Sequence, residues 1–253
     1  RALQSLAFSG LRMVSNVCWL RVWVLWYRSC LRMNRRHLIA SLPAAFAVST
    51  FAAAGSKLRV AIIGHTGRGN YGHGLDTMWK AIPASEIVAI ADADATGLAA
   101  ELKKIEAGKG FDDYQAMLSK VKPDIVAIGP RHVDQHRDMM LAAIQNGAKG
   151  IYIEKPFLRS LAECDEVIAA AEKSGTKIAI AHRNRYHPAL AMVAKLISDG
   201  AIGRVLEMRG RGKEDPRGGS LDMWVLGSHV MSAAIALAGA PRACTAGVYQ
   251  NGR

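Results

Sequence analysis

Three glycines that follow an apolar run could hold a phosphate group. Gly64, Gly67 and Gly69 lie in the sequence GHTGRG, directly after the strand-like run of residues 59–63. Glycine at such a turn lets the backbone approach a pyrophosphate, whose charge is met by free N–H groups and by the positive end of a following helix. The spacing therefore predicts a dinucleotide-binding turn that leads into a helix.

Two registers of the glycine pattern fit this turn. In the first, residues 64–69 form GxGxxG with Thr66 in place of the second glycine, and in the second, residues 67–72 supply a complete set. The first register is favoured because Gly64 stands at the strand end, and Thr66 then narrows the approach of the phosphates. The alternative is an ordinary tight turn in another kind of α/β protein.

An acidic residue closes the same unit. Asp92 ends a second apolar run, residues 87–91, where a carboxylate can accept hydrogen bonds from an adenosine ribose. Ala93 and Asp94 follow it, so no Arg or Lys stands beside it to hold a 2′-phosphate. The sequence favours NAD over NADP.

A parallel sheet is needed to bring these residues together. Apolar runs with the length of strands alternate with helical patterns, which predicts a doubly wound sheet with its ligands at the carboxyl ends of the strands. The expected strands are residues 59–63, 87–91, 124–129, 150–154 and 177–181.

The alternation changes after His187. We expect a helix that ends at Gly200, a half-buried strand at 204–211, a second helix through residues 226–237 and a strand at 243–250. The predicted fold class is α/β, with a Rossmann sheet followed by an incomplete α+β domain that has an open antiparallel sheet. The domains are a leader over 1–57, the Rossmann domain over 58–182 and the partial second domain over 183–253.

The positive charge of the chain is concentrated in the leader. The formal net charge is +12, yet eight of the 33 basic residues and none of the 21 acidic residues lie in residues 1–57. The rest of the chain is close to balanced, so we expect no nucleic-acid partner.

The leader contains a pattern typical of an export signal. From Met33 the sequence has a twin arginine, Arg35-Arg36, then a moderately apolar stretch, then small residues at 52–54. This resembles a twin-arginine signal and predicts a periplasmic or exported protein, with residues 1–32 as upstream sequence. A basic amphipathic helix in a cytoplasmic protein is the alternative, and the export signal is the only membrane contact expected.

The four cysteines do not have the spacing of metal ligands. Cys18, Cys30, Cys164 and Cys244 form no CxxC pair. We therefore predict neither a disulfide framework nor a metal site.

Several motifs beyond the glycine turn resemble one enzyme family. They are VAIADAD, PDIVAIGPRHVDQH, GIYIEKPF, AHRNRYHP, GAIGRV and GGSLDMWVLGSH. With them, residues 58–253 resemble the glucose–fructose oxidoreductase / inositol dehydrogenase (Gfo/Idh/MocA) family, which has a Rossmann domain followed by an open antiparallel sheet. Members extend well past the point that matches Arg253, so the resemblance implies a C-terminally truncated second domain.

The resemblance assigns roles near the nicotinamide. The lysine of the family's EKP motif lies beside the nicotinamide and the reacting hydroxyl, and this role falls on Lys155. The adjacent Glu154 is a further candidate for cofactor binding. Removing hydride from a carbinol requires a group that takes its proton, and a nearby nicotinamide cation lowers the pKa of a lysine. Pro130 and His136 match positions near the same half of the cofactor, with helix capping as the alternative.

The second domain is expected to supply a histidine. His229 matches a family histidine that contacts the substrate hydroxyl and shares the acid–base work. The family commonly places aspartates four residues before and three after it, where this chain has Val225 and Ser232. Asp222 is the nearest carboxylate and the candidate replacement.

Polar residues after the last Rossmann strand are the candidate substrate contacts. His182, Asn184 and Arg185 follow that strand, and Lys213 lies in a glycine-rich loop. They suit a substrate with several hydroxyl groups. The alternative is that this segment only caps and joins the domains.

Together, these features predict an NAD-dependent oxidoreductase that acts on a secondary hydroxyl of a sugar, polyol or glycoside. An exported enzyme would have to restore its bound NAD in each cycle, so a redox-neutral NAD-assisted glycosidase or lyase, or an aldose–ketose oxidoreductase, is one alternative. A non-catalytic NAD- or sugar-binding protein is another. The family resemblance also implies a homo-oligomer for the full-length protein.

Overall fold

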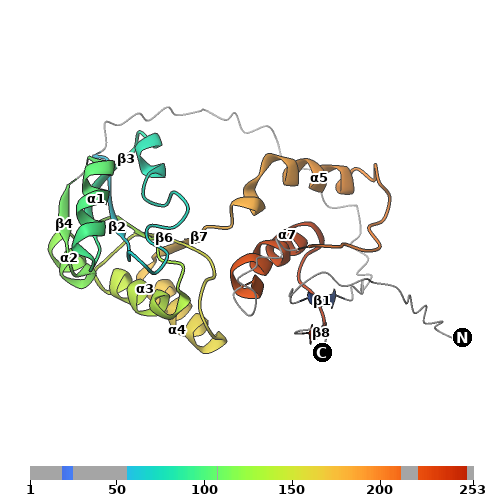
Figure 1. Cartoon of the computed structure of the whole chain (residues 1–253). Helices are drawn as coiled ribbons and strands as arrows, with labels where there is room; N and C mark the ends of the chain where they lie inside the picture. Colours follow the sequence, from blue (N-terminus) through green and yellow to red (C-terminus); the bar gives the residue numbers. More distant parts are fainter. Residues whose placement is uncertain (1–18, 25–55, 107, 212–221, 250–253) are drawn as a thin grey trace, which may run out of the picture. The chain divides into compact units, whose positions relative to one another are not determined.

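The computed structural model describes residues 19–24, 56–106, 108–211 and 222–249 (Figure 1). The chain divides into two compact units, of which one spans residues 30–183 and the other combines residues 1–29 with residues 184–253. Each unit is described by itself.

The first unit is built on a six-stranded parallel sheet, which confirms the Rossmann fold class. The strand order is β4-β3-β2-β5-β6-β7. The chain fills one half of the sheet from β2 to β4 and the other from β5 to β7, so the order reverses between β2 and β5, where such sheets bind ligands. The strands are β2 (Leu58–Ile63), β3 (Ser85–Ala91), β4 (Lys109–Phe111), β5 (Ile125–Ile128), β6 (Gly150–Ile153) and β7 (Lys177–Ile180).

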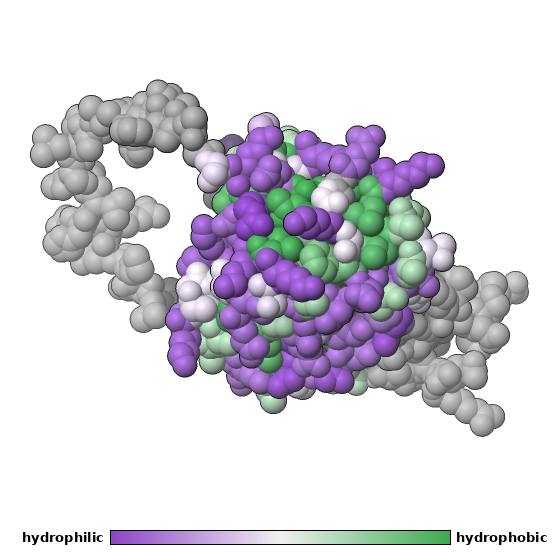
Figure 2. All heavy atoms as spheres, turned by 90° about the vertical axis from the view of Figure 1, so that its left-hand side faces the viewer, coloured by the Kyte–Doolittle hydropathy of each residue, from purple (hydrophilic) through white to green (hydrophobic). Residues whose placement is uncertain are grey.

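Alternate residues of each strand point to opposite sides of the sheet. Each side packs against its own set of helices or turn residues. Ala61 and Ile63 belong to a buried cluster with α2 (Tyr114–Val121), α3 (His136–Gln145) and α4 (Leu161–Ser174). Val60 and Ile62 pack on the other side with α1 (Ala95–Ile105) and with Tyr71 and Trp79. Figure 2 looks onto the β4 edge of the sheet, where hydrophilic residues cover most of the surface.

Side-chain caps fix the starts of α1, α2 and α4. The Asp94 carboxylate accepts a hydrogen bond from Gly97 N, Asp113 accepts from two amides of the first turn of α2, and Ser160 accepts from Glu163 N. Each cap satisfies a backbone donor that a helix start leaves unpaired. α4 ends at Gly175 in the left-handed region, which glycine adopts without strain.

The helix predicted directly after Gly64 does not form. Residues 65–77 run as successive turns, followed only by the 3₁₀ helix η1 (Met78–Ala81). The glycines of this segment take φ values of +82° at Gly67, +100° at Gly69, +69° at Gly72 and +86° at Gly74. These values interrupt the right-handed helix, so residues 65–77 themselves supply no helix N-terminus for a phosphate.

The second unit contains the helices expected after His187. They are α5 (Pro188–Ser198) and α7 (Ser228–Ala238). Two further turns were not predicted, the 3₁₀ turn η3 (Arg183–Tyr186) and the π-helical turn η4 (Asp222–Gly227). The predicted strand at 204–211 is wrong, because that segment carries no strand pairing. A strand needs a hydrogen-bonded neighbour, and none of the described strands supplies one there.

A strand also lies within the predicted leader. β1 (Trp19–Val24) pairs antiparallel with β8 (Cys244–Tyr249), in a register that sets Trp19 opposite Tyr249. The twin-arginine segment lies outside the described residues. Over the described ranges, no helix is long and apolar enough to cross a membrane.

Candidate active site

Asp92 is held in place by the glycine turn. Its carboxylate is buried and accepts hydrogen bonds from Thr66 N at 3.0 and 3.2 Å, from Thr66 Oγ1 at 2.7 Å and from Asp94 N at 3.0 Å. A Cβ on Gly97 would lie 1.8 Å from Thr66 Oγ1, so the first turn of α1 needs glycine for this contact. Thr66 therefore orients the acid that was predicted to meet a ribose.

Gly64 makes room for a ring. A Cβ at Gly64 would lie 2.1 Å from the Tyr71 side chain, so the missing side chain admits an aromatic residue of the same turn. Burial, and next the neighbouring Asp92 carboxylate, raise the pKa of Tyr71. The predicted close approach of Gly64 to a pyrophosphate stays a prediction beside this contact with Tyr71.

The middle of the turn is tied to the loop after β5. Arg68 forms an ion pair with Asp134 at 2.7 Å, and His65 Nδ1 lies 2.9 Å from Gln135 Nε2. A Cβ on Gly69 would lie 2.5 Å from Arg131 N, so the two segments touch through backbone. The turn is thereby fixed across the point where the strand order reverses.

Glu154 and Lys155 stand at the carboxyl end of β6, and both are buried, at 1% and 3% exposure. Glu154 Oε1 lies 2.5 Å from His73 Nδ1, and Glu154 Oε2 accepts a hydrogen bond from Lys155 N at 2.9 Å. Glu154 was predicted near the cofactor, yet both its oxygens have partners within the chain. Its observed role is to join the glycine turn to β6.

His136 links the loop after β5 to the loop after β6 through hydrogen bonds. It is fully buried, with Nε2 2.7 Å from the Pro130 carbonyl oxygen and Nδ1 3.0 Å from the Phe157 carbonyl oxygen. The ring therefore presents no surface to a ligand. His136 instead positions the loop after β5, to which Pro130 belongs.

The residues around the turn fit a dinucleotide. Gly67 is exposed, and a Cβ there would meet nothing within 4 Å, which leaves open space beside the turn. Gln135 Oε1 is a buried acceptor that makes no hydrogen bond within the described part of the chain. Asp92, at the end of the neighbouring strand, is a buried carboxylate whose oxygens are held by Thr66 and Asp94.

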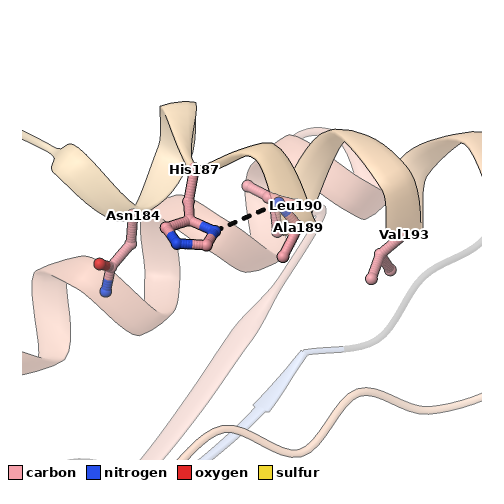
Figure 3. Close-up of a pocket in the computed structure, with 5 residues that line it drawn as sticks. All are labelled: Asn184, His187, Ala189, Leu190 and Val193. Atoms are coloured by element: carbon pink, nitrogen blue, oxygen red, sulfur yellow. Dashed lines mark hydrogen bonds between the residues drawn. The ribbon is translucent and has the colours of Figure 1, made fainter.

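The second unit contains most of the predicted substrate residues. Asn184 and His187 line a pocket of about 260 Å³ with Ala189, Leu190 and Val193 (Figure 3). His187 Nδ1 accepts a hydrogen bond from Ala189 N at 3.2 Å and so caps α5.

The other predicted contacts divide between the two units. Arg185 Nη1 reaches the Ser232 carbonyl oxygen of α7 at 3.4 Å, within the second unit. His182 is half-buried and follows β7 in the first unit. Lys213 lies outside the described residues.

The predicted proton-transfer residues also divide between the units. Lys155 belongs to the first unit, whereas the half-buried His229 lies on α7 and Asp222 begins η4 in the second. The structure thus brings Lys155 together with Glu154 and with the glycine turn.

Sequence reasoning missed a cluster of charged residues beside the turn. Asp76 and Glu101 are buried, and Lys104 contacts both carboxyl groups. They line a cavity of about 490 Å³ between the turn and α1. The spacing of Glu101 and Lys104 on one helix was a signal for two of the three residues, but Asp76 lies 28 residues before Lys104.

His73 was also missed. His73 stands between two glycines, directly after the second GxGxxG register. The flanking glycines, which both adopt positive φ, were the one signal in the sequence that this histidine lies in an unusual turn. Its partner Glu154 lies 81 residues away in the sequence, so no local pattern could reveal the contact.

Comparison with known proteins identifies the first unit. Residues 58–182 match the family model GFO_IDH_MocA, described as an oxidoreductase family with an NAD-binding Rossmann fold. These residues include the glycine turn, Asp92 and Lys155.

Two curated relatives are sugar or polyol dehydrogenases. The chain is 34% identical over 125 residues to D-apiose dehydrogenase of Paraburkholderia graminis, a match that covers 49% of this chain and 33% of that protein. It is 33% identical over 129 residues to inositol 2-dehydrogenase of Salmonella typhimurium, covering 50% of this chain and 38% of that protein. The chain thus spans between a third and two fifths of the length of these relatives.

Solved structures share the fold. Myo-inositol 2-dehydrogenase from Lactobacillus plantarum superposes with a TM-score of 0.63 at 22% identity, over 73% of this chain and 57% of that one. An oxidoreductase from Agrobacterium radiobacter in complex with NAD⁺, L-tartaric acid and magnesium gives 0.60 at 20% identity, over 73% and 55%. Over residues 58–182, the chain belongs to the Gfo/Idh/MocA oxidoreductase family as its NAD-binding Rossmann domain.

Proposed function

We propose that the protein is an NAD-dependent oxidoreductase that acts on a secondary hydroxyl group of a sugar, polyol or glycoside. The observation that supports this most directly is the placement of Lys155. It is buried at the carboxyl end of β6, on the same edge of the sheet as the glycine turn and Asp92. A lysine side chain is buried where it has partners or a task, and accepting a proton beside a cofactor, as a neutral amine, is such a task.

In this proposal the residues of the chain bind the cofactor and move one proton. The turn at Gly67 and the Asp92 carboxylate hold the two ends of the adenosine diphosphate portion, and Lys155 accepts the proton of the reacting hydroxyl. His229 shares that proton transfer from the second unit. The nicotinamide, when bound, accepts the hydride.

The substrate class follows from the polar groups near the domain junction. His182, Asn184 and Arg185 offer hydrogen-bond donors and acceptors in sequence next to β7. Such groups suit a molecule with several hydroxyls, and the dehydrogenases of apiose and inositol among the relatives act on molecules of that kind. A small carbohydrate is therefore the proposed substrate, and a homo-oligomer is the proposed state of the complete protein.

Replacing Lys155 tests the proposal. With a panel of polyols, aldoses and glycosides, Lys155→Ala should lower kcat by about 10²- to 10⁴-fold, the usual value of a general acid–base residue. The dissociation constant for NAD, measured by calorimetry, should stay within about threefold. The exposed Lys173 on α4 supplies the matched control, Lys173→Ala, which should leave both quantities unchanged.

Other outcomes separate the alternative functions. Unchanged turnover in Lys155→Ala would overturn the assignment of the base. Glycoside cleavage without accumulation of NADH would point to redox-neutral chemistry, in which bound NAD is restored within the cycle. NAD binding without turnover on the whole panel would indicate a non-catalytic binding protein.

We further propose that the protein is exported through the twin-arginine route. The support is the sequence from Met33, with Arg35-Arg36, an apolar stretch and small residues before Ser56. That route carries folded proteins, which suits a domain that binds its cofactor before export.

A further inference from the structure

We propose that His73 is a positioning residue for Lys155 and acts through the carboxylate of Glu154. This inference rests on the proposed role of Lys155 as the proton acceptor. The residues involved come from two segments that are 81 positions apart and meet at the carboxyl edge of the sheet.

The first step is the burial of Glu154. Its side chain is 2% exposed, and its two oxygens are used separately. Oε1 lies 2.5 Å from His73 Nδ1, and Oε2 accepts the Lys155 amide hydrogen at 2.9 Å. A buried carboxylate without donors is costly, so each of these contacts holds the other in place.

The second step is the backbone that delivers His73. Gly72 and Gly74 flank it with φ values of +69° and +86°. A Cβ on Gly72 would lie 2.8 Å from the Gly129 carbonyl oxygen and 3.3 Å from Glu154 Cγ. The turn can approach β6 this closely only with glycine at that position, which then aims the histidine at the carboxylate.

The third step is the contrast in exposure. The His73 side chain is 60% exposed, whereas Lys155 is 3% exposed. The exposed ring of His73 thus contacts Glu154, whose other oxygen holds the backbone N–H of the buried Lys155. Any change in the turn that moves His73 reaches Lys155 through one carboxylate, and a displacement of about 1 Å at a catalytic group can cost about 100-fold in rate.

Three variants of His73 test the inference. His73→Ala and His73→Leu remove the donor to Glu154, and Leu also fills the space, while His73→Asn keeps a nitrogen donor near the place of Nδ1. We expect Ala and Leu to lower kcat about 10- to 100-fold with the KM for NAD within twofold, and Asn to restore kcat to within about threefold of wild type. The exposed His132→Ala is the matched control and should change neither quantity.

A second readout does not depend on turnover. Competitive acetylation followed by mass spectrometry reports the reactivity of the Lys155 amine relative to the exposed Lys109. We expect the relative rate at Lys155 to change at least threefold in His73→Leu and to return in His73→Asn. A protein that turns over no substrate but shows this pattern would contradict the proposed function while supporting the role of His73.

The inference is overturned if Asn and Leu at position 73 behave alike in acetylation and in kcat. It is also overturned if the variants lower thermal stability yet leave the reactivity of Lys155 unchanged, because His73 would then only stabilise the turn. Melting temperatures of all variants are recorded to make that distinction.

Discussion

At the scale of single residues, the surroundings of Glu101 change the pKa of its carboxyl group. Burial, and next its hydrogen bond with Asp76, raise the pKa of Glu101 to about 7. Burial acts against the shift at Asp76, but hydrogen bonds from Glu101 and Lys104 lower the pKa of that carboxyl group. Between pH 4.5 and 7 the native protein therefore holds a proton that the unfolded chain has released.

This difference predicts a dependence of stability on pH. Because the native state binds more protons, the contribution of Glu101 to the free energy of unfolding should fall from about pH 4.5 to about pH 7 and stay constant above. Glu101→Gln mimics the protonated group, so its melting temperature relative to wild type should rise across that window. Thermal unfolding at four pH values measures it, with the exposed Glu172→Gln as control. A constant difference would contradict the proton assigned to Glu101.

The site residues differ in how far they could be predicted from the sequence. Asp92 and Lys155 could be found because each follows an apolar run, and the ends of parallel strands meet at one edge. We predicted that Thr66 narrows the approach of the phosphates, whereas in the structure its hydroxyl group donates a hydrogen bond to the Asp92 carboxylate. That contact joins segments 26 residues apart, and spacing alone could not show it.

At the scale of elements, the glycine turn replaces a helix. It contacts Asp92 beyond β3, Asp134 beyond β5 and Glu154 beyond β6. Its conformation is thus set by the sheet edge and by left-handed glycines, rather than by helical hydrogen bonds.

Alanine at two of these glycines should have unequal effects. Both Gly67 and Gly69 have positive φ, so a Cβ costs about 1–2 kcal/mol at either. Only at Gly69 would the Cβ also meet backbone, at 2.5 Å from Arg131 N. Gly69→Ala should therefore lower the free energy of unfolding, measured in urea, by at least about 1 kcal/mol more than Gly67→Ala. Equal losses would show that the turn moves freely relative to the loop after β5.

The elements were predictable in proportion to their length and periodicity. The runs that became β2, β3, β5, β6 and β7 were found within two residues, since each is an apolar stretch bounded by turns. The three-residue strand β4 and the short α2 gave no comparable signal. The helix after Gly64 was predicted from analogy with the motif, and its own glycines prevented it.

At the scale of the whole molecule, the candidate chemistry depends on two units. The sequence indicates a change of organisation near His187, where the Rossmann alternation stops, but not that residues 1–29 group with residues 184–253. The pairing of β1 with β8 could not be predicted, since it joins segments from opposite ends of the chain.

The proposed export concerns the molecule as a whole and predicts where it is found. Residues 33–57 fused to a reporter that is exported only when folded should direct the reporter to the periplasm. Arg35→Lys with Arg36→Lys should retain it in the cytoplasm, because this route reads the paired arginines. Fractionation and reporter activity measure the distribution, and export that survives the double change would contradict the assignment.

One aromatic residue beside the turn has an optical consequence. Trp79 is the only tryptophan in residues 58–182. Its ring is 8% exposed, donates a hydrogen bond to the Leu75 carbonyl oxygen and meets Tyr152 of β6 edge to face, with ring centroids 6.1 Å apart. Indole emission shifts to longer wavelength when water reaches the ring. The Rossmann domain therefore contains a single tryptophan, whose emission reports how tightly the segment after the glycine turn is packed against the sheet.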